Sequence, residues 1–378
     1  MKITAPASTW ATIFNVAKKH TSSDHAVRLS VSGGQAWVGA KGLVSTLALK
    51  LPAGHASGAG TVYVPPNRIY QTAKSLSGGP MTLRWEEGAD EAEISSGSGF
   101  EASFAIGGRV EVDLPSAPDG PDETWSAASL RGALERTLPA TSSNDADTHL
   151  QGVCLDLPSG TVAATDEKIL SCVGLGDETG WRETLPEPAC ERLLGVLPES
   201  GDVDVVLGER TFFASWEGGT LSARLLAATE EFPEYQRVVP SEDPPVQIHC
   251  ERGLLVDALR RVSAYVSDEE GYVRMEWNGT ALVMRGGEME AGCGAHEKVP
   301  VTAGHTDTGG GHEGLLANVS TDYLLAQLKA YGADTVALAF RGTERLMSVI
   351  PAPEKNSGAT AGYIMPMRVK DSKMQIPA

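Results

Sequence analysis

Hydrophobic positions along the chain switch between helical and strand spacing in a fixed order. Trp10, Phe14 and Ala17 lie three to four positions apart, a spacing that predicts the buried face of an amphipathic helix. Two runs of alternating apolar and polar residues follow, AVRLSVS and QAWVGA, and they meet at Gly33-Gly34. Such runs joined by a glycine pair predict a β-hairpin after the helix.

The same order returns twice. A predicted helix opened by Ser126 carries Leu130, Leu134 and Leu138 and precedes GVCLDLP and TVAATD. Near residue 255 another helix precedes YVRMEW and TALVMRG, joined at Asn278-Gly279. A second helix in each third is predicted over about 66–76, 186–197 and 321–331, each followed by an apolar strand. The pattern predicts an α+β protein of six βαβββ half-units.

Two Pro- and Asp-rich segments, PSAPDGPDE at 115–123 and PSEDPP at 240–245, separate these thirds. We therefore predict three repeated domains of two half-units each, over residues 1–118, 119–244 and 245–378.

Composition narrows the functional classes. The chain has 378 residues and a formal charge of −18, so it does not present an overall basic surface to nucleic acid or anionic membrane. Its start lacks the apolar core of a secretory signal, and no window reaches 18 apolar residues. The five cysteines are odd in number and widely spaced. We expect a cytoplasmic protein without a disulfide framework and without membrane contact.

Basic side chains occur on all six predicted helices, although single basic residues also commonly solvate helix surfaces. If the helices shared one concave surface, that surface would suit sequence-independent phosphate contact. The candidate DNA-facing residues are Lys18, Lys19, Arg68, Lys74, Arg131, Arg136, Arg192, Arg260, Arg261 and Lys329.

Enzyme signatures are incomplete. His296-Glu297 and His312-Glu313 begin like a zinc-protease motif, but no second His follows either pair. Cys293 and His305 add possible metal ligands nearby, in a spacing that matches no tetrahedral site. GLGDETG at 174–180 lacks nucleotide-binding spacing. We predict no catalytic residues, no metal and no cofactor, with an unrelated metal-dependent enzyme as the weakest alternative.

Three motifs carry a resemblance to a known family. EEFPEYQRVVP at 230–240 is similar to the Phe-Pro-Asp-Tyr-Arg-Arg-Val-Leu-Pro linker of the beta sliding clamps of bacterial DNA polymerase III, and YIMPMRV at 363–369 resembles their C-terminal Met-Pro-Met-Arg. HLQGVCLDL with VAATDEKIL matches their second domain more weakly. The motifs fall in the family's order.

The resemblance implies a head-to-tail homodimeric ring, with helices lining the hole and sheets outside. Such a ring encircles double-stranded DNA without reading its sequence and tethers the polymerase for processive replication. Encirclement would reconcile a charge of −18 with a DNA partner. The implied protein partners are DNA polymerase III, clamp-loader subunits and repair proteins that carry clamp-binding motifs.

The family also has a pocket for short linear peptides. Apolar and Met side chains suit such a groove because they adapt to different anchors, although Met365 and Met367 could instead be core residues. The matched pocket positions are Leu150, Thr165, Leu170, Pro233, Arg237, Val238, Ile364, Met365, Pro366, Met367 and Arg368.

Ring closure would join the edge strand of the first domain to the third domain of a second copy. Phe104 and Ile106, with Ala264 and Tyr265, are the matched interface candidates, and all four are also plausible core residues.

The chain departs from the family at three places. Glu167, Lys168 and Ile169 stand where relatives have Gly-His-Arg, and Thr148-His149 replaces an aromatic pair on a DNA-facing loop. VKDSKMQIPA continues past the usual end, and we expect this tail to lie near the pocket and compete with peptides. These departures keep open a second interpretation: a clamp paralogue with altered partners, serving repair, a mobile element or inhibitor tolerance.

Overall fold

The computed structural model describes most of the chain. The described residues are 1–21, 26–76, 78–106, 112–115, 120–176, 180–227, 230–266, 271–288, 293–306, 314–352 and 360–369. Of the C-terminal extension, residues 370–378 lie outside them, so the predicted tail contact stays a prediction.

The first third of the chain carries two helices. Its elements are β1 (Lys2–Pro6), α1 (Ala7–Ala17), β2 (Val27–Ser32), β3 (Gln35–Lys41), β4 (Ser45–Leu51), β5 (His55–Ser57), β6 (Gly60–Val64), α2 (Pro66–Ser75), β7 (Pro80–Trp85), β8 (Glu91–Ser96) and β9 (Glu101–Ala105).

The second third repeats this order, with four short 3₁₀ turns. Its elements are β10 (Glu123–Ser126), α3 (Ala127–Thr137), η1 (Leu138–Ala140), η2 (Thr148–Leu150), β11 (Gly152–Asp156), η3 (Leu157–Ser159), β12 (Thr161–Thr165), β13 (Ile169–Gly174), β14 (Arg182–Pro186), α4 (Glu187–Leu194), β15 (Asp202–Gly208), β16 (Thr211–Trp216), β17 (Gly219–Arg224) and η4 (Tyr235–Arg237).

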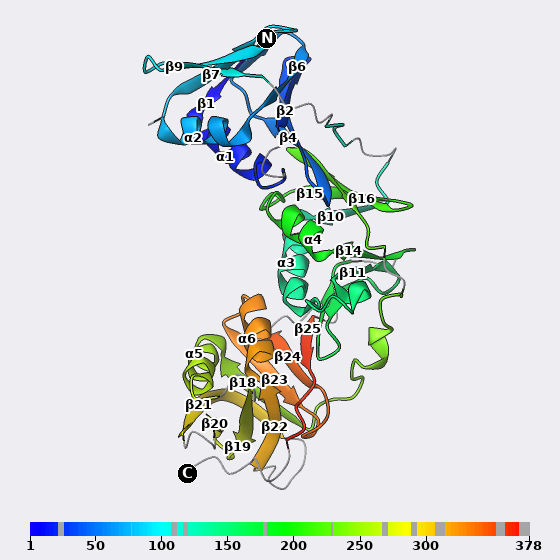
Figure 1. Cartoon of the computed structure of the whole chain (residues 1–378). Helices are drawn as coiled ribbons and strands as arrows, with labels where there is room; N and C mark the ends of the chain where they lie inside the picture. The colour runs from blue at the N-terminus through cyan, green and yellow to red at the C-terminus, as the bar shows by residue number, and fades with distance from the viewer. Residues whose placement is uncertain are drawn as a thin grey trace. The chain divides into compact units, whose positions relative to one another are not determined.

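The last third repeats it again (Figure 1). Its elements are β18 (Val246–Glu251), α5 (Arg252–Ser263), β19 (Tyr272–Trp277), β20 (Ala281–Glu288), β21 (Cys293–Thr306), β22 (Gly314–Ser320), α6 (Thr321–Ala330), β23 (Thr335–Phe340), β24 (Met347–Ala352) and β25 (Ala361–Ile364). Apart from the short β5, the described elements give βαβββ six times, which confirms the predicted α+β class and repeat.

Paired half-units exchange their first strands. β1 pairs with β7 of the second half-unit, and β6 of the second half-unit pairs with β2 of the first. The same exchange joins β10 to β15 and β14 to β11, and then β18 to β23 and β22 to β19. Each half-unit therefore lacks a complete sheet of its own, which explains why the repeat works in pairs.

The helices form where the apolar spacing predicts them. α1 buries Trp10, Phe14 and Ala17, and the Trp10 indole donates a hydrogen bond to the Met81 carbonyl at 3.1 Å. At the start of α3, the Ser126 hydroxyl accepts a hydrogen bond from the Ser129 amide at 3.0 Å, as an N-cap does. Burial of the apolar face fixes each helix on its sheets.

Two predicted helix ends were too late. α4 ends at Leu194 rather than near 197, because Gly195 and Pro198 do not support a further turn. Leu138 begins the separate 3₁₀ turn η1 instead of extending α3, since Pro139 follows it.

The chain divides into two compact units. Unit 1 comprises residues 1–131 and 188–227, and unit 2 comprises 132–187 and 228–378. Unit 1 holds a five-stranded sheet, β5-β1-β7-β8-β9, and an eight-stranded sheet, β10-β15-β16-β17-β4-β3-β2-β6; unit 2 holds a twelve-stranded sheet, β14-β11-β12-β13-β25-β24-β23-β18-β21-β20-β19-β22. The three predicted domains remain a prediction alongside this division.

Candidate functional site

An apolar pocket of about 240 Å³ lies in unit 2, where segments far apart in the sequence meet. Its walls come from the loop between β12 and β13, the linker around η4, and the chain on either side of β24 and β25. The lining residues are Thr165, Glu167, Lys168, Ile169, Leu170, Pro233, Glu234, Tyr235, Val238, Leu346 and Met365. An apolar hollow with a few polar groups at its rim suits a hydrophobic peptide anchor.

The β12–β13 loop is fixed by its own hydrogen bonds. One Asp166 carboxylate oxygen accepts the amides of Lys168 and Ile169 at 2.9 and 2.8 Å, and the Thr165 hydroxyl accepts the Glu167 amide at 3.0 Å. Glu167 has φ of 73°, a left-handed conformation that favours glycine and is strained for a side chain. The loop therefore holds a left-handed turn at a glutamate.

The linker wall is held by a buried carboxylate. Asp156 is 2% exposed. One of its carboxylate oxygens accepts hydrogen bonds from the Tyr235 hydroxyl at 2.9 Å and from the side-chain amide of Gln236 at 2.6 Å. The Arg182 guanidinium donates to the Pro233 carbonyl and to Glu234, both at 2.7 Å. Burial raises the pKa of Tyr235, with its bond to Asp156 as a further cause, so the phenol stays a donor at neutral pH.

The third wall follows β25. This strand pairs with β13, and the Met365 amide then donates to the Lys168 carbonyl at 2.8 Å, which ties the segment to the pocket rim. The Met367 amide donates to the Asn318 carbonyl at 2.8 Å. Met365 and Met367 are 44% and 38% exposed. Both therefore present apolar surface to solvent instead of completing the core.

A cluster of buried hydrophobic side chains lies behind the pocket and includes two of its lining residues, Leu170 and Tyr235. Its buried residues are Leu150, Cys154, Ala163, Leu170, Cys172, Phe232, Tyr235, Ala361 and Tyr363. Burial raises the pKa of the Cys154 and Cys172 thiols to about 12, so both stay protonated. The five cysteines are free, and four of them are buried. The cluster gives the pocket a rigid apolar floor.

The predicted pocket residues fall into three groups. Thr165, Leu170, Pro233, Val238 and Met365 line the pocket itself. Leu150 and Ile364 are fully buried, in the cluster behind the pocket and in β25. Arg237 lines a second hollow that shares Val238 and Met365 with the pocket, while Pro366, Met367 and Arg368 continue the chain past Met365.

Sequence reasoning missed some lining residues. Glu234 and Tyr235 belong to the quoted linker motif, and Glu167, Lys168 and Ile169 to the second-domain motif, so both motifs could have supplied them. Leu346 precedes β24 and belongs to no motif, so no sequence signal indicated it.

The second hollow adjoins the apolar pocket and has a volume of about 430 Å³. Its lining residues are Arg237, Val238, Val239, Pro240, Ser241, Glu242, Arg341, Glu344, Arg345, Leu346 and Met365. The Arg341 guanidinium donates to the Ser348 hydroxyl at 2.9 Å and to the Glu242 carbonyl at 3.4 Å. Burial lowers the pKa of Arg341.

The candidate DNA-facing residues of unit 1 lie on or beside its helices. The Lys18 ammonium sits 3.6 Å from the Tyr70 ring centroid, and that of Lys74 sits 5.8 Å from it. Burial, Arg192 and Lys19 lower the pKa of His20 to about 4. Arg131 donates to the carbonyls of Leu194 and Leu197 at the end of α4. Lys19 and Arg68 are exposed.

In unit 2, several of the candidates contact other side chains. Arg136 lies over the Tyr331 ring at 5.9 Å, Arg260 pairs with Asp257 at 3.7 Å, and Arg261 binds both carboxylate oxygens of Glu297. Lys329 is exposed on α6. DNA contact by these ten residues stays a prediction.

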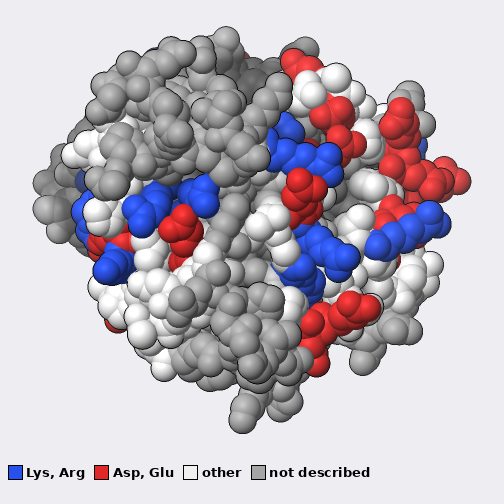
Figure 2. Space-filling view, turned by 90° about the horizontal axis from the view of Figure 1, so that it is seen from below, with Lys and Arg blue, Asp and Glu red and all other residues white. Residues whose placement is uncertain are grey.

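Acidic and basic side chains are interleaved on one face of the molecule. Figure 2 shows Lys and Arg beside Asp and Glu on the face seen from below. Glu276 accepts hydrogen bonds from Arg274 at 2.6 Å and from Arg285 at 3.0 Å, and these bonds lower its pKa although burial acts in the opposite direction. Arg274 and Arg285 are thus already paired with a neighbouring acid.

The candidate interface residues differ in exposure. Phe104 on β9 is 6% exposed, so its side chain packs inside unit 1, whereas Ile106 is partly exposed. After α5, Ala264 is exposed and Tyr265 is 49% exposed. β9 is the edge strand of its sheet, as the predicted joint requires. The joint itself stays a prediction.

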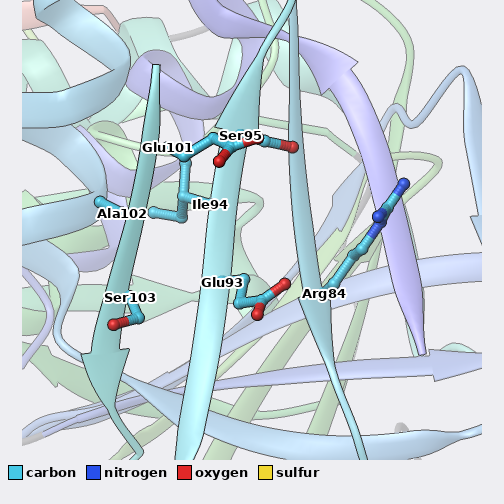
Figure 3. Close-up of a pocket in the computed structure, with 7 residues that line it drawn as sticks. All are labelled: Arg84, Glu93, Ile94, Ser95, Glu101, Ala102 and Ser103. Carbon is cyan, nitrogen blue, oxygen red and sulfur yellow. The ribbon is translucent and has the colours of Figure 1, made fainter. Parts of the chain in front are cut away.

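A polar hollow of about 340 Å³ lies on the outer strands β7, β8 and β9 (Figure 3). Arg84, Glu93 and Glu101 place both signs of charge around it, and Ile94, Ser95, Ala102 and Ser103 complete the lining. No motif predicted this hollow, and it lacks the apolar lining of the pocket in unit 2.

Within the described part of the chain, no three His, Cys, Asp or Glu side chains gather in a way that could hold a metal ion. No helix there is long and apolar enough to cross a membrane. The side chains of His305 and His312 fall outside the described set.

Comparison with known proteins identifies the fold. No protein-family model matches the chain, and no curated protein matches its sequence. Solved structures match along almost the whole length: the DNA polymerase beta subunit of Streptococcus pyogenes (TM-score 0.84, 16% identity) and the DNA polymerase III beta subunits of Pseudomonas aeruginosa (0.80, 22%) and Thermotoga maritima (0.80, 19%). Each comparison covers 98% of this chain and 100% of the other.

The fold is therefore that of a DNA polymerase sliding clamp. More narrowly, it is the fold of the beta subunit of DNA polymerase III, which confirms the predicted resemblance at the level of the fold.

Proposed function

We propose that the chain is a DNA polymerase III beta sliding clamp. Two copies would close a head-to-tail ring of six domains, bounded within each chain at 1–118, 119–244 and 245–378. The ring would encircle duplex DNA in the cytoplasm and tether the polymerase without catalysing a reaction itself. The whole-length likeness to beta subunits supports this proposal.

The observation that carries the proposal is the apolar pocket in unit 2. Three segments that resemble the family's motifs come together there, although they are widely separated in the sequence. Val238 and Met365 are 54% and 44% exposed at the pocket. Exposed apolar side chains that gather in one place are typical of a binding site. An open apolar site on a rigid floor supports peptide capture from polymerases, clamp loaders and repair proteins.

Solved structures with the same fold add chemical support. A Pseudomonas aeruginosa clamp is bound to griselimycin, and a Borrelia burgdorferi beta subunit is in complex with a natural product. These two clamps of the same fold thus bind ligands, which is consistent with a ligand pocket in this chain.

A paralogue with altered partners is the second candidate function. The strained Glu167 at the pocket rim favours it, because a carboxylate there changes the charge that an incoming peptide meets. Both candidates share the ring and the pocket, and they differ in which peptides bind.

Fluorescence anisotropy with a labelled Gln-Leu-rich clamp-binding peptide tests the proposal. We expect saturable binding that Met365→Ala weakens about tenfold, since truncating a central apolar contact typically costs one or two kcal/mol. Leu43→Ala is the matched control, because Leu43 is 91% exposed in unit 1 and away from the pocket. An absence of saturable binding, or an equal loss of affinity in both variants, would refute peptide binding at this pocket.

A further inference from the structure

The hollow beside the apolar pocket differs from it in charge. The two share Val238, Leu346 and Met365, so the hollow directly adjoins the pocket. Arg237, Arg341 and Arg345 line the hollow together with Glu242 and Glu344. This cluster of arginines stands out on a chain of charge −18.

Two of these arginines have no carboxylate partner in the described part of the chain. Arg341 is held by Ser348 and by the Glu242 carbonyl, and Glu344 pairs with Arg368 at 3.3 Å. Within the described residues, neither Arg237 nor Arg345 forms an ion pair with a carboxylate. Both are exposed, so their guanidinium groups are open to a ligand.

Other arginines of the same unit already have acidic partners. Arg182 pairs with Glu234, Arg261 with Glu297, and Arg285 with Glu276. Arg237 and Arg345 differ from these three arginines because no carboxylate among the described residues pairs with them. A guanidinium offers a planar fork of donors that fits a carboxylate in two parallel hydrogen bonds.

We propose that the hollow binds a side-chain carboxylate of the same peptide whose apolar anchors fill the pocket. The preferred partner segment then combines apolar anchor residues with a flanking Asp or Glu that reaches Arg237 or Arg345. This inference rests on the proposed function of the pocket, and it names the chemistry by which this chain selects among clamp-binding peptides.

Twin peptides provide the test. Labelled Gln-Leu-rich peptides carry either Glu or Gln immediately before or immediately after the anchors, and anisotropy at low ionic strength gives their affinities. We expect one Glu peptide to bind about two- to fivefold more tightly than its Gln twin, the range of solvent-exposed ion pairs. Added salt should remove the difference.

Variants locate the source of the preference. Arg237→Gln or Arg345→Gln should abolish the advantage of the Glu peptide over its Gln twin. Arg84→Gln is the control: it makes the same charge change on β7 of unit 1 and should retain the advantage of the Glu peptide. Equal binding of the twins, or a preference that survives both hollow variants, would overturn the inference while the pocket stands. Failure of all four peptides to bind would overturn the proposed function and this inference with it.

Discussion

Glu167 is held in a left-handed backbone conformation at the rim of the apolar pocket. The turn requires φ of 73°, and the amides of Glu167, Lys168 and Ile169 all donate to side chains of the loop. The hydrogen bonds therefore enforce a conformation that a glutamate side chain disfavours by about 1–2 kcal/mol. Among the described residues, Glu167 is the one non-glycine residue with positive φ.

Replacing this glutamate should relieve the strain. We expect Glu167→Gly to raise the free energy of unfolding by about 0.5–1 kcal/mol, because the greater freedom of glycine in the unfolded chain offsets part of the gain. Urea denaturation measures the change.

Lys168→Gly is the matched control, since Lys168 is not in the left-handed region, and it should lower stability. Equal destabilisation by both substitutions would show that the left-handed conformation at residue 167 costs nothing.

At the scale of elements, one wall of the pocket is the linker around η4, which belongs to no strand. Pro233, Tyr235 and Val238 belong to or flank η4, which packs on unit 2 through Asp156, Arg182 and the buried ring of Tyr235. Asp156 lies at the end of β11, so a strand end positions a wall of the pocket. Loss of the contact between Tyr235 and Asp156 should therefore lower both the stability of the protein and its affinity for the peptide.

Tyr235→Phe tests that connection. It leaves the ring in place but removes the hydroxyl that donates to Asp156, and an undersatisfied buried carboxylate costs about 1–3 kcal/mol. We expect a lower urea midpoint together with weaker binding of the Gln-Leu-rich peptide.

Tyr63→Phe makes the same change on β6 of unit 1 and should leave peptide affinity unaltered. Unchanged affinity in Tyr235→Phe would separate the linker contact from the pocket.

The repeat itself was readable from the sequence. The helical face of Trp10, Phe14 and Ala17 and the glycine-joined hairpin after it occur as predicted, because local spacing and turn chemistry decide them. The strand exchange between half-units was not readable, since pairing partners such as β1 and β7 are far apart in the chain.

The site was only partly readable for the same reason. The motifs indicated Thr165, Pro233 and Met365, whereas Leu346 reaches the pocket through tertiary packing alone. The unpaired state of Arg237 and Arg345 depends on which acids the fold brings near them, and spacing along the chain carries no such information.

At the scale of the whole molecule, the central claim is a closed ring. A chain of charge −18 with interleaved surface charges has little general affinity for DNA, so encirclement is what would retain it there. Encirclement would require a second copy, which the proposal joins at β9, the edge strand of its sheet in the described part of the chain.

Light scattering of the purified full-length chain tests this claim most directly. The account predicts one species of twice the 39.7 kDa chain mass, unchanged as the protein is diluted through the micromolar range. A species of 39.7 kDa at every concentration would contradict the ring, even if the peptide pocket still bound its ligands.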